Sequence, residues 1–190
     1  MRLVLSTRNA HKVRELQPLL APYELDPLPD DVELPPETGT TFAENALGKA
    51  RAAAVATGRP AFADDSGISA AALDGAPGIY SARFAGEDAT DQENLDKLLR
   101  EAPDGSRVAY VCAIAYVGRD GAEHVVEGRC EGTLADRPRG SGGFGYDPAF
   151  VPVEHPDRTM AELEPAEKDA ISHRGRAARA LLEWLEHRHG

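Results

Sequence analysis

The chain has 190 residues, 42% of them hydrophobic and 28% charged, which fits one globular domain over residues 1–190 that can form two lobes around a substantial core. No apolar run approaches the roughly 20 residues of a membrane-spanning helix, and the apolar N-terminal stretch is too short for a signal peptide, so we expect a cytoplasmic protein. The formal net charge of −11 disfavours nucleic acid as a partner, because an acidic surface repels phosphate backbones.

Two residue types carry further information. Cys112 and Cys130 lack CxxC spacing, so we expect reduced packing residues and no zinc site. Only four of the 21 basic residues are lysines, and a chain that otherwise uses arginine can keep lysine where a compact charge meets a phosphate. The four lysines are Lys12, Lys49, Lys97 and Lys168.

The N-terminal residues predict a strand, a turn and a helix. Residues 3–7 are strand-like, Asn9 is a good N-cap, and Lys12 lies in the first helical turn. A strand–turn–helix entry of this kind suits an anion, because N–H groups point outward and Lys12 adds charge. Ordinary capping explains the same residues, and Pro18 must kink or shorten the helix.

Residues 23–28 predict a second strand, and an irregular acidic loop that contains Glu37 follows it. Thr41 and Glu44 have capping-box spacing, which predicts a helix to about Gly58. Asn45 and Lys49 are four residues apart and therefore share one helix face. Helix spacing alone favours a solvent-facing position for that pair.

Asp64 and Asp65 follow the short apolar run 60–63 and precede Ser66 and Gly67. The pattern predicts a strand that ends in a sharp turn, with both carboxylates at its C-terminal edge, where open α/β sheets bind ligands. Adjacent carboxylates repel each other unless a cation or a proton lies between them, which points to Mg²⁺. A turn cap that faces water is the alternative interpretation.

The remaining elements follow in order. Glycine and proline make residues 75–83 a shaped loop, and Thr90 begins a second capping box for a helix to Ala102. Residues 107–117 and 122–134 predict a hairpin. In the glycine-rich stretch 139–148 the backbone can approach a ligand closely, and its two aromatic residues could stack on a base or pack. The tail is helical from about Pro165, with a break at Ser172 or Gly175.

Six of these segments together resemble the inosine triphosphate pyrophosphatase family, in order and along the whole chain. They are residues 7–12, 37–46, 63–67, 75–83, 142–148 and 171–175. The resemblance implies an α/β fold with a mixed twisted sheet flanked by helices, in two lobes with an active-site cleft between them. It also implies a homodimer that uses Mg²⁺ and hydrolyses ITP, dITP and XTP to a nucleoside monophosphate and pyrophosphate.

The resemblance assigns site residues by position. Asp65 matches the catalytic acid, and Glu37 with Asp65 would hold the metal. The substrate would be bound by Thr7, Arg8, Asn9, Ala10, His11, Lys12, Lys49, Ser66, Phe144, Gly145, Tyr146, Asp147, Lys168, His173 and Arg174. Arg8 departs from the glycine that many members have there.

Elementary chemistry agrees with this assignment. Phosphoryl transfer needs neutralised charge and a placed water, which Mg²⁺, three lysines and a carboxylate can provide. Donors from His173 and Arg174 can select a purine with an oxygen at position 6. Two other enzymatic or binding functions stay open, a diphosphatase for other modified nucleotides and a non-catalytic nucleotide sensor, while an RNA-binding module is disfavoured by the acidic charge.

Overall fold

The computed structural model describes residues 2–189. Its helices are α1 (Ala10–Leu19), α2 (Phe42–Thr57), α3 (Asp91–Glu101), α4 (Pro165–Ile171) and α5 (His173–His189), with short 3₁₀ turns at Ala71–Leu73, Gly78–Arg83, Asp147–Ala149 and Met160–Glu162. Its strands are β1 (Arg2–Leu5), β2 (Glu24–Pro27), β3 (Ala61–Ala70), β4 (Arg107–Val117), β5 (Glu123–Leu134) and β6 (Phe150–Pro152). No helix within residues 2–189 is long and apolar enough to cross a membrane.

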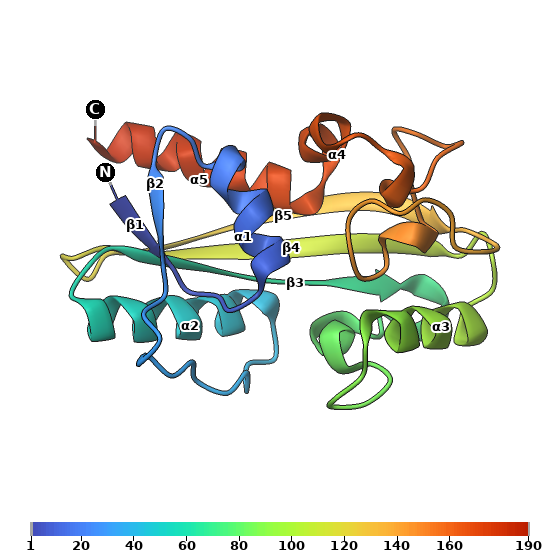
Figure 1. Cartoon of the computed structure of the whole chain (residues 1–190), viewed down its shortest axis with the longest axis horizontal. Coiled ribbons are helices and arrows are strands. Elements are labelled where there is room, and N and C mark those ends of the chain that lie inside the picture. The colour runs from blue at the N-terminus through green and yellow to red at the C-terminus, as the bar shows by residue number, and fades with distance from the viewer. Residues whose placement is uncertain (1, 190) are drawn as a thin grey trace. The chain divides into compact units, whose positions relative to one another are not determined.

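The strands form a mixed six-stranded sheet in the order β2-β1-β3-β4-β5-β6 (Figure 1). β1 pairs in parallel with β2 and with β3, whereas β5 pairs antiparallel with β6. This confirms the prediction of an α/β fold with a mixed sheet and flanking helices.

The described chain divides into two compact units. Unit 1 comprises residues 2–65, 112–128 and 174–189, and unit 2 comprises residues 66–111 and 129–173. Strands β3, β4 and β5 each contribute residues to both units. Each unit has its own apolar core.

The core of unit 1 follows from strand alternation. Successive side chains of a strand point to opposite faces, so Phe62 and Ile114 pack on one face with α1 and α5, while Ala63 and Ala113 pack on the other with α2. Figure 1 shows α1 and α5 on one side of these strands and α2 on the other. The α2 face is lined by alanines, which let the helix approach the strands closely.

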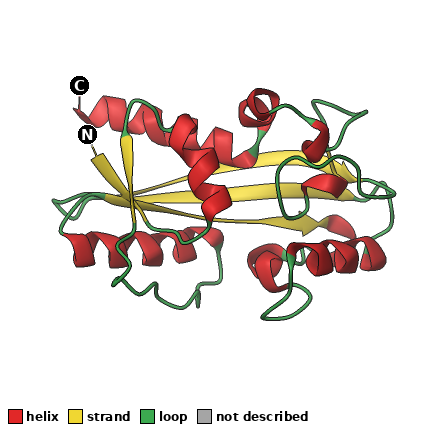
Figure 2. Ribbon diagram, in the orientation of Figure 1, coloured by secondary structure: helices red, strands yellow, loops and turns green. Residues whose placement is uncertain are grey.

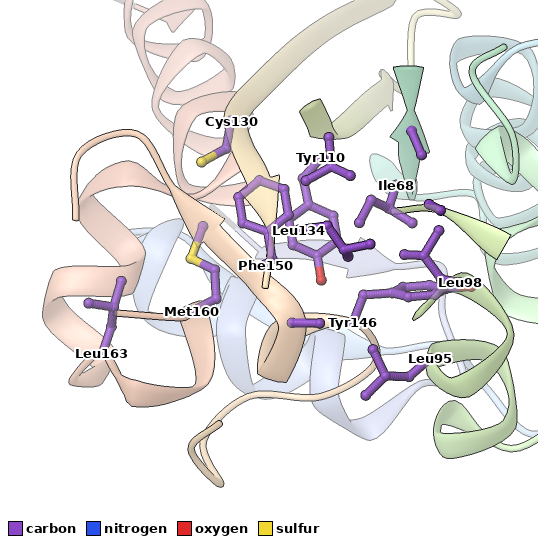
Figure 3. Packing of buried hydrophobic residues seen from close by; sticks show 14 residues of the cluster. Ile68, Leu95, Leu98, Tyr110, Cys130, Leu134, Tyr146, Phe150, Met160 and Leu163 are labelled. Atoms are coloured by element: carbon purple, nitrogen blue, oxygen red, sulfur yellow. The ribbon is translucent and has the colours of Figure 1, made fainter. Parts of the chain in front are cut away.

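The core of unit 2 gathers aromatic and aliphatic side chains, among them Tyr110, Tyr146 and Phe150 (Figure 3). Tyr110 stacks on Phe150 with ring centroids 4.4 Å apart, and Tyr146 lies in the same cluster. Within this unit, α3 and α4 lie on opposite sides of the strands (Figure 2). Leu95 and Leu98 of α3 are buried there, at a spacing that places both on one face of the helix.

Two sequence predictions need correction. β3 does not end at Asp65 but continues to Ala70, because Ser66 and Gly67 keep extended backbone and Gly67 does not adopt a positive φ. Asn45 and Lys49 are buried rather than solvent-facing, because their face of α2 packs toward β3. The predicted caps at Asn9, Thr41 and Thr90 are confirmed, and the tail breaks at Ser172.

Candidate active site

Asp65 is the centre of a polar cluster in unit 1. Its carboxylate lies on the α2 side of β3, where Oδ2 accepts a hydrogen bond from Asn45 Nδ2 at 3.1 Å. Oδ1 lies 3.3 Å from Lys49 Nζ, and the same ammonium donates to Glu37 Oε1 at 2.7 Å. Asn45 and Lys49 are one helical turn apart on α2, which aims both donors at one acceptor. The structure therefore gathers Glu37, Lys49 and Asp65 as the sequence predicted, and adds Asn45.

Burial dominates the electrostatics of Asp65. It raises the pKa of the Asp65 carboxyl, with Glu37 adding to the rise and the Lys49 ammonium opposing it. Burial would lower the pKa of Lys49, but Asp65 and Glu37 outweigh it and the pKa of Lys49 is raised. A carboxylate with a raised pKa beside a stable ammonium can accept a proton and keep a cation close.

Asp64 lies on the opposite side of β3 and is 1% exposed. Its Oδ2 is 3.0 Å from Lys12 Nζ and accepts hydrogen bonds from Arg174 Nη2 and Nε at 3.2 and 3.3 Å. Arg174 also pairs with Glu15 of α1. Burial would raise the pKa of Asp64, but Lys12 and Arg174 outweigh it and hold that pKa well below its usual value.

The two acids therefore do not share one cation. Because adjacent strand residues point to opposite faces, Asp64 faces α1 and α5 while Asp65 faces α2. The prediction that one metal lies between the paired carboxylates is wrong in this respect. The carboxylate on the same face as Asp65 is that of Glu37, 28 residues earlier in the chain and bridged to Asp65 by Lys49.

The turn before α1 is tightly hydrogen-bonded. Asn9 Oδ1 accepts from the backbone N–H groups of His11 and Lys12 at 2.9 and 3.3 Å, and Asn9 N–H donates to Thr7 Oγ1 at 3.1 Å. Asn9 thus uses two of the donors that we expected to point outward at an anion. Ala10 begins the helix without contributing a polar side chain.

Arg8 reaches away from this turn. Its guanidinium donates to the backbone carbonyls of Leu28, Pro29 and Val32 at 2.8, 2.6 and 2.9 Å. The residue expected to bind substrate is therefore engaged with the acidic loop that leads to Glu37. These three hydrogen bonds explain how the bulky Arg8 side chain is accommodated beside the turn, because the guanidinium takes the place of water as the donor to the loop carbonyls.

A second polar cluster lies in unit 2 around Asp147. Oδ2 of this buried carboxylate accepts from Lys168 Nζ at 2.7 Å and from Phe144 N–H at 3.0 Å, while Oδ1 accepts from the Tyr110 hydroxyl at 3.0 Å. Gly143 has φ 69°, and a Cβ there would lie 2.0 Å from Asp147 Oδ2. The glycine-rich stretch is thus folded around one ion pair.

The aromatic residues of this stretch behave differently from each other. Tyr146 is 6% exposed and its hydroxyl donates to the Ser81 carbonyl at 2.6 Å, so its ring packs in the core rather than facing a ligand. Phe144 is only half-buried, and Lys168 Nζ lies 5.5 Å from its ring centroid. Gly145 N–H donates to Asp91 of α3 at 3.0 Å.

His173 is buried in unit 2 and stacks on Tyr110 with ring centroids 4.5 Å apart. Within unit 2 the structure therefore brings together five predicted residues, namely Phe144, Gly145, Asp147, Lys168 and His173. Ser66 directly follows Asp65 in the chain and is half-buried.

Local sequence patterns give no signal for two residues of these polar clusters, Tyr110 and Glu15, and only a weak one for the pair Asn45 and Lys49. Tyr110 links Asp147 to His173, yet it lies in an apolar strand run that gave no functional signal. Glu15 holds Arg174 across 159 residues of sequence, a separation that local patterns do not bridge. The spacing of Asn45 and Lys49 was a usable signal, but only burial distinguishes it from a solvated pair.

An α/β sheet that carries buried lysine–carboxylate clusters and a tight glycine-rich turn is typical of enzymes that bind phosphorylated ligands. The chain matches the Ham1 family over residues 3–184 and belongs to that family.

Two curated relatives are similar over nearly their whole length. The dITP/XTP pyrophosphatase of Streptomyces coelicolor is 52% identical over 192 residues, covering 95% of each chain. That of Escherichia coli O157:H7 is 50% identical over 194 residues, covering 97% of this chain and 98% of its own.

Solved structures agree with this assignment. A HAM1 protein from Coxiella burnetii superposes with a TM-score of 0.88 at 43% identity, covering 98% of this chain and 99% of its own. The nucleoside-triphosphatase, dITP/XTP pyrophosphatase, from Mycobacterium abscessus has a TM-score of 0.75 at 46% identity, covering 96% of this chain and 99% of its own.

Proposed function

We propose that this chain is a nucleoside triphosphate pyrophosphatase that hydrolyses ITP, dITP and XTP to the nucleoside monophosphate and pyrophosphate. The observation that carries the proposal is the buried carboxylate of Asp65, held by Asn45 and Lys49 beside Glu37. It occurs in a chain 50–52% identical to curated dITP/XTP pyrophosphatases over nearly its whole length. The biological effect is to remove non-standard purine nucleotides before they enter DNA or RNA.

The donor set fits a magnesium ion. Mg²⁺ in nucleotide-binding sites uses one or two carboxylates and completes its shell with phosphate oxygens and water. Glu37 and Asp65 supply two such carboxylates, and a cation, the Lys49 ammonium, already bridges them. When bound, Mg²⁺ neutralises phosphate charge and polarises the reacting phosphoryl group.

The protein residues have separable tasks in this proposal. Asp65 accepts the proton of the attacking water. Asn45 fixes the orientation of the Asp65 carboxylate through Oδ2. Lys12 and Lys49 supply positive charge to the triphosphate from unit 1, and the resemblance assigns the same task to Lys168.

Base recognition is assigned to residues 144–147 and to His173 and Arg174. Hypoxanthine and xanthine carry an oxygen at position 6, where adenine has an amino group. A buried hydrogen-bond donor in the site is therefore satisfied by hypoxanthine or xanthine and left unpaired by adenine. Of the two aromatic residues, the half-buried Phe144 is the one whose ring can meet a base, because Tyr146 is committed to the core. Arg174 is held by Asp64 and Glu15, so its contribution to the base is part of the proposal.

We also propose a homodimer that acts in the cytoplasm and does not bind nucleic acid. Two buried free thiols, Cys112 and Cys130, suit a reducing compartment. The net charge of −11 opposes binding to nucleic acid. Sedimentation at micromolar concentration tests the dimer, and a monomer there contradicts it.

The test of the function is a pyrophosphate-release assay with Mg²⁺ across ITP, dITP, XTP, GTP and ATP, with modified pyrimidine triphosphates as further substrates. We expect ITP, dITP and XTP to give pyrophosphate and the monophosphate, each with a kcat/KM at least about 10²-fold above that of ATP. This ratio is below the discrimination that mismatched hydrogen bonds can provide. Preferential cleavage of a modified pyrimidine would assign the chain to another diphosphatase class. Binding without any pyrophosphate release would make it a nucleotide sensor.

A further inference from the structure

Lys49 lies where two carboxylates need a cation. Its Nζ is 2.7 Å from Glu37 Oε1 and 3.3 Å from Asp65 Oδ1, and its side chain is largely buried. The backbone of Lys49 is also anchored, because its carbonyl accepts a hydrogen bond from the Ser6 hydroxyl at 2.9 Å. The ammonium is therefore placed between the two acids by a fixed helix and a flexible side chain.

The same two oxygens cannot serve an ammonium and a divalent ion equally well at one time. A metal ligated by Glu37 and Asp65 would lie close to Lys49 Nζ. Two cations close together in a buried site repel each other strongly. The Lys49 side chain has a flexible stem of four methylene groups, so its ammonium can leave these oxygens without movement of α2. It leaves at little cost only if another anion receives it.

We propose that Lys49 is an internal counter-ion that occupies the metal position between Glu37 and Asp65 until nucleotide binds. When the triphosphate binds, the ammonium would transfer from the carboxylates to phosphate oxygens, and Glu37 and Asp65 would then hold the metal. This rests on the proposed function, since it uses the metal and the triphosphate named there. By linkage, nucleotide must strengthen metal binding by the same factor by which metal strengthens nucleotide binding.

Lys12 provides a matched control. It is also a partly buried lysine of unit 1, and its Nζ pairs with Asp64 Oδ2 at 3.0 Å on the other side of β3. Replacing either lysine by methionine removes one positive charge and keeps an unbranched apolar stem. Both variants therefore lose one positive charge in unit 1, whereas only Lys49→Met loses the direct contact with Glu37 and Asp65.

The experiment measures Mn²⁺ binding to the full chain without nucleotide, by titration calorimetry and by electron paramagnetic resonance of the free ion. We expect Lys49→Met to bind Mn²⁺ at least tenfold more tightly than wild type, and Lys12→Met at most threefold more tightly. Lys49→Gln, which keeps a neutral donor, should fall between wild type and Lys49→Met, and it replaces Lys49→Met if that variant does not fold. Unchanged or weaker binding in Lys49→Met, or equal tightening in both methionine variants, overturns the proposal.

A second arm separates this inference from the function on which it rests. Mn²⁺ binding to wild type is measured with an ITP analogue that has a methylene bridge between the α and β phosphates. Strong Mn²⁺ binding with the analogue, combined with no tightening in nucleotide-free Lys49→Met, refutes the counter-ion role and leaves the metal site intact. Absence of Mn²⁺ binding in every state refutes both.

Discussion

The ion pair between Asp147 and Lys168 offers the most direct test of the structure. The Asp147 carboxylate satisfies three donors at once, the Lys168 ammonium, the Phe144 N–H and the Tyr110 hydroxyl. Asp147→Ala would remove this acceptor from a buried ammonium, from the buried Tyr110 hydroxyl and from the part-buried Phe144 N–H. Breaking a buried pair from one side costs about 3–5 kcal/mol. For a chain of this length each kcal/mol lowers Tm by roughly 2–4 °C, so we expect a fall of about 6–20 °C.

The double variant Asp147→Ala/Lys168→Met isolates the pair. Methionine removes the ammonium that has lost its contact with Asp147, so the double variant should be less destabilised than the sum of the two single variants by about 1–3 kcal/mol. Differential scanning calorimetry and urea unfolding measure all four proteins, and far-UV circular dichroism checks the native secondary structure. A fall in Tm of less than about 2 °C for Asp147→Ala, or additive single effects, would refute the reasoning, since either result means that Asp147 is not the hub of a buried cluster.

Three further predictions concern catalysis. Asp65→Asn keeps the shape of the side chain, but it cannot accept a proton, and its one amide oxygen can accept from only one of Asn45 and Lys49. We expect kcat to fall by about 10²–10⁴-fold, with far-UV circular dichroism to check that the fold is kept; near wild-type turnover would make Asp65 structural. The proposed mechanism needs the ionised form of Asp65, whose pKa is raised in the free enzyme, so kcat/KM should begin to fall with decreasing pH above the usual aspartate pKa of about 4. Lys49→Met removes the ammonium that opposes the rise and should move this acidic side of the pH profile to still higher pH. A fall in kcat/KM that begins only at or below about pH 4 contradicts this. Arg174→Ala should lower kcat/KM for ITP more than for ATP if its guanidinium serves the base, whereas equal losses for both would restrict Arg174 to its contacts with Asp64 and Glu15.

Local signals in the sequence were sufficient for most of the secondary structure. Asn9, Thr41 and Thr90 begin helices because each side chain accepts backbone N–H groups of the first turn, a property that needs no tertiary contact. The hairpin strands β4 and β5 were equally visible from their length and the turn residues between them. The end of β3 was not predictable in this way, because a Ser-Gly pair permits a turn without requiring one.

The site was harder to predict than the fold, because its geometry depends on partners distant in sequence. Helix periodicity places Asn45 and Lys49 on one face of α2, but only the packing of that face toward β3 turns a solvated pair into a buried one. Tyr146 shows the reverse case, since an aromatic residue among glycines looks available to a ligand until the Ser81 carbonyl engages its hydroxyl. In each case the deciding quantity is burial, which a local pattern does not contain.

Strand alternation explains why two adjacent aspartates have different chemistry. Asp64 faces two cations, Lys12 and Arg174, which together keep it ionised and therefore make it a poor proton acceptor. Burial raises the pKa of Asp65, and the ammonium of Lys49, which Asp65 shares with Glu37, opposes that rise only in part. A displacement of one residue along β3 would exchange the two environments, because every side chain would change faces. The proposed role of Asp65 in proton transfer therefore depends on the register of β3 as much as on the residue type.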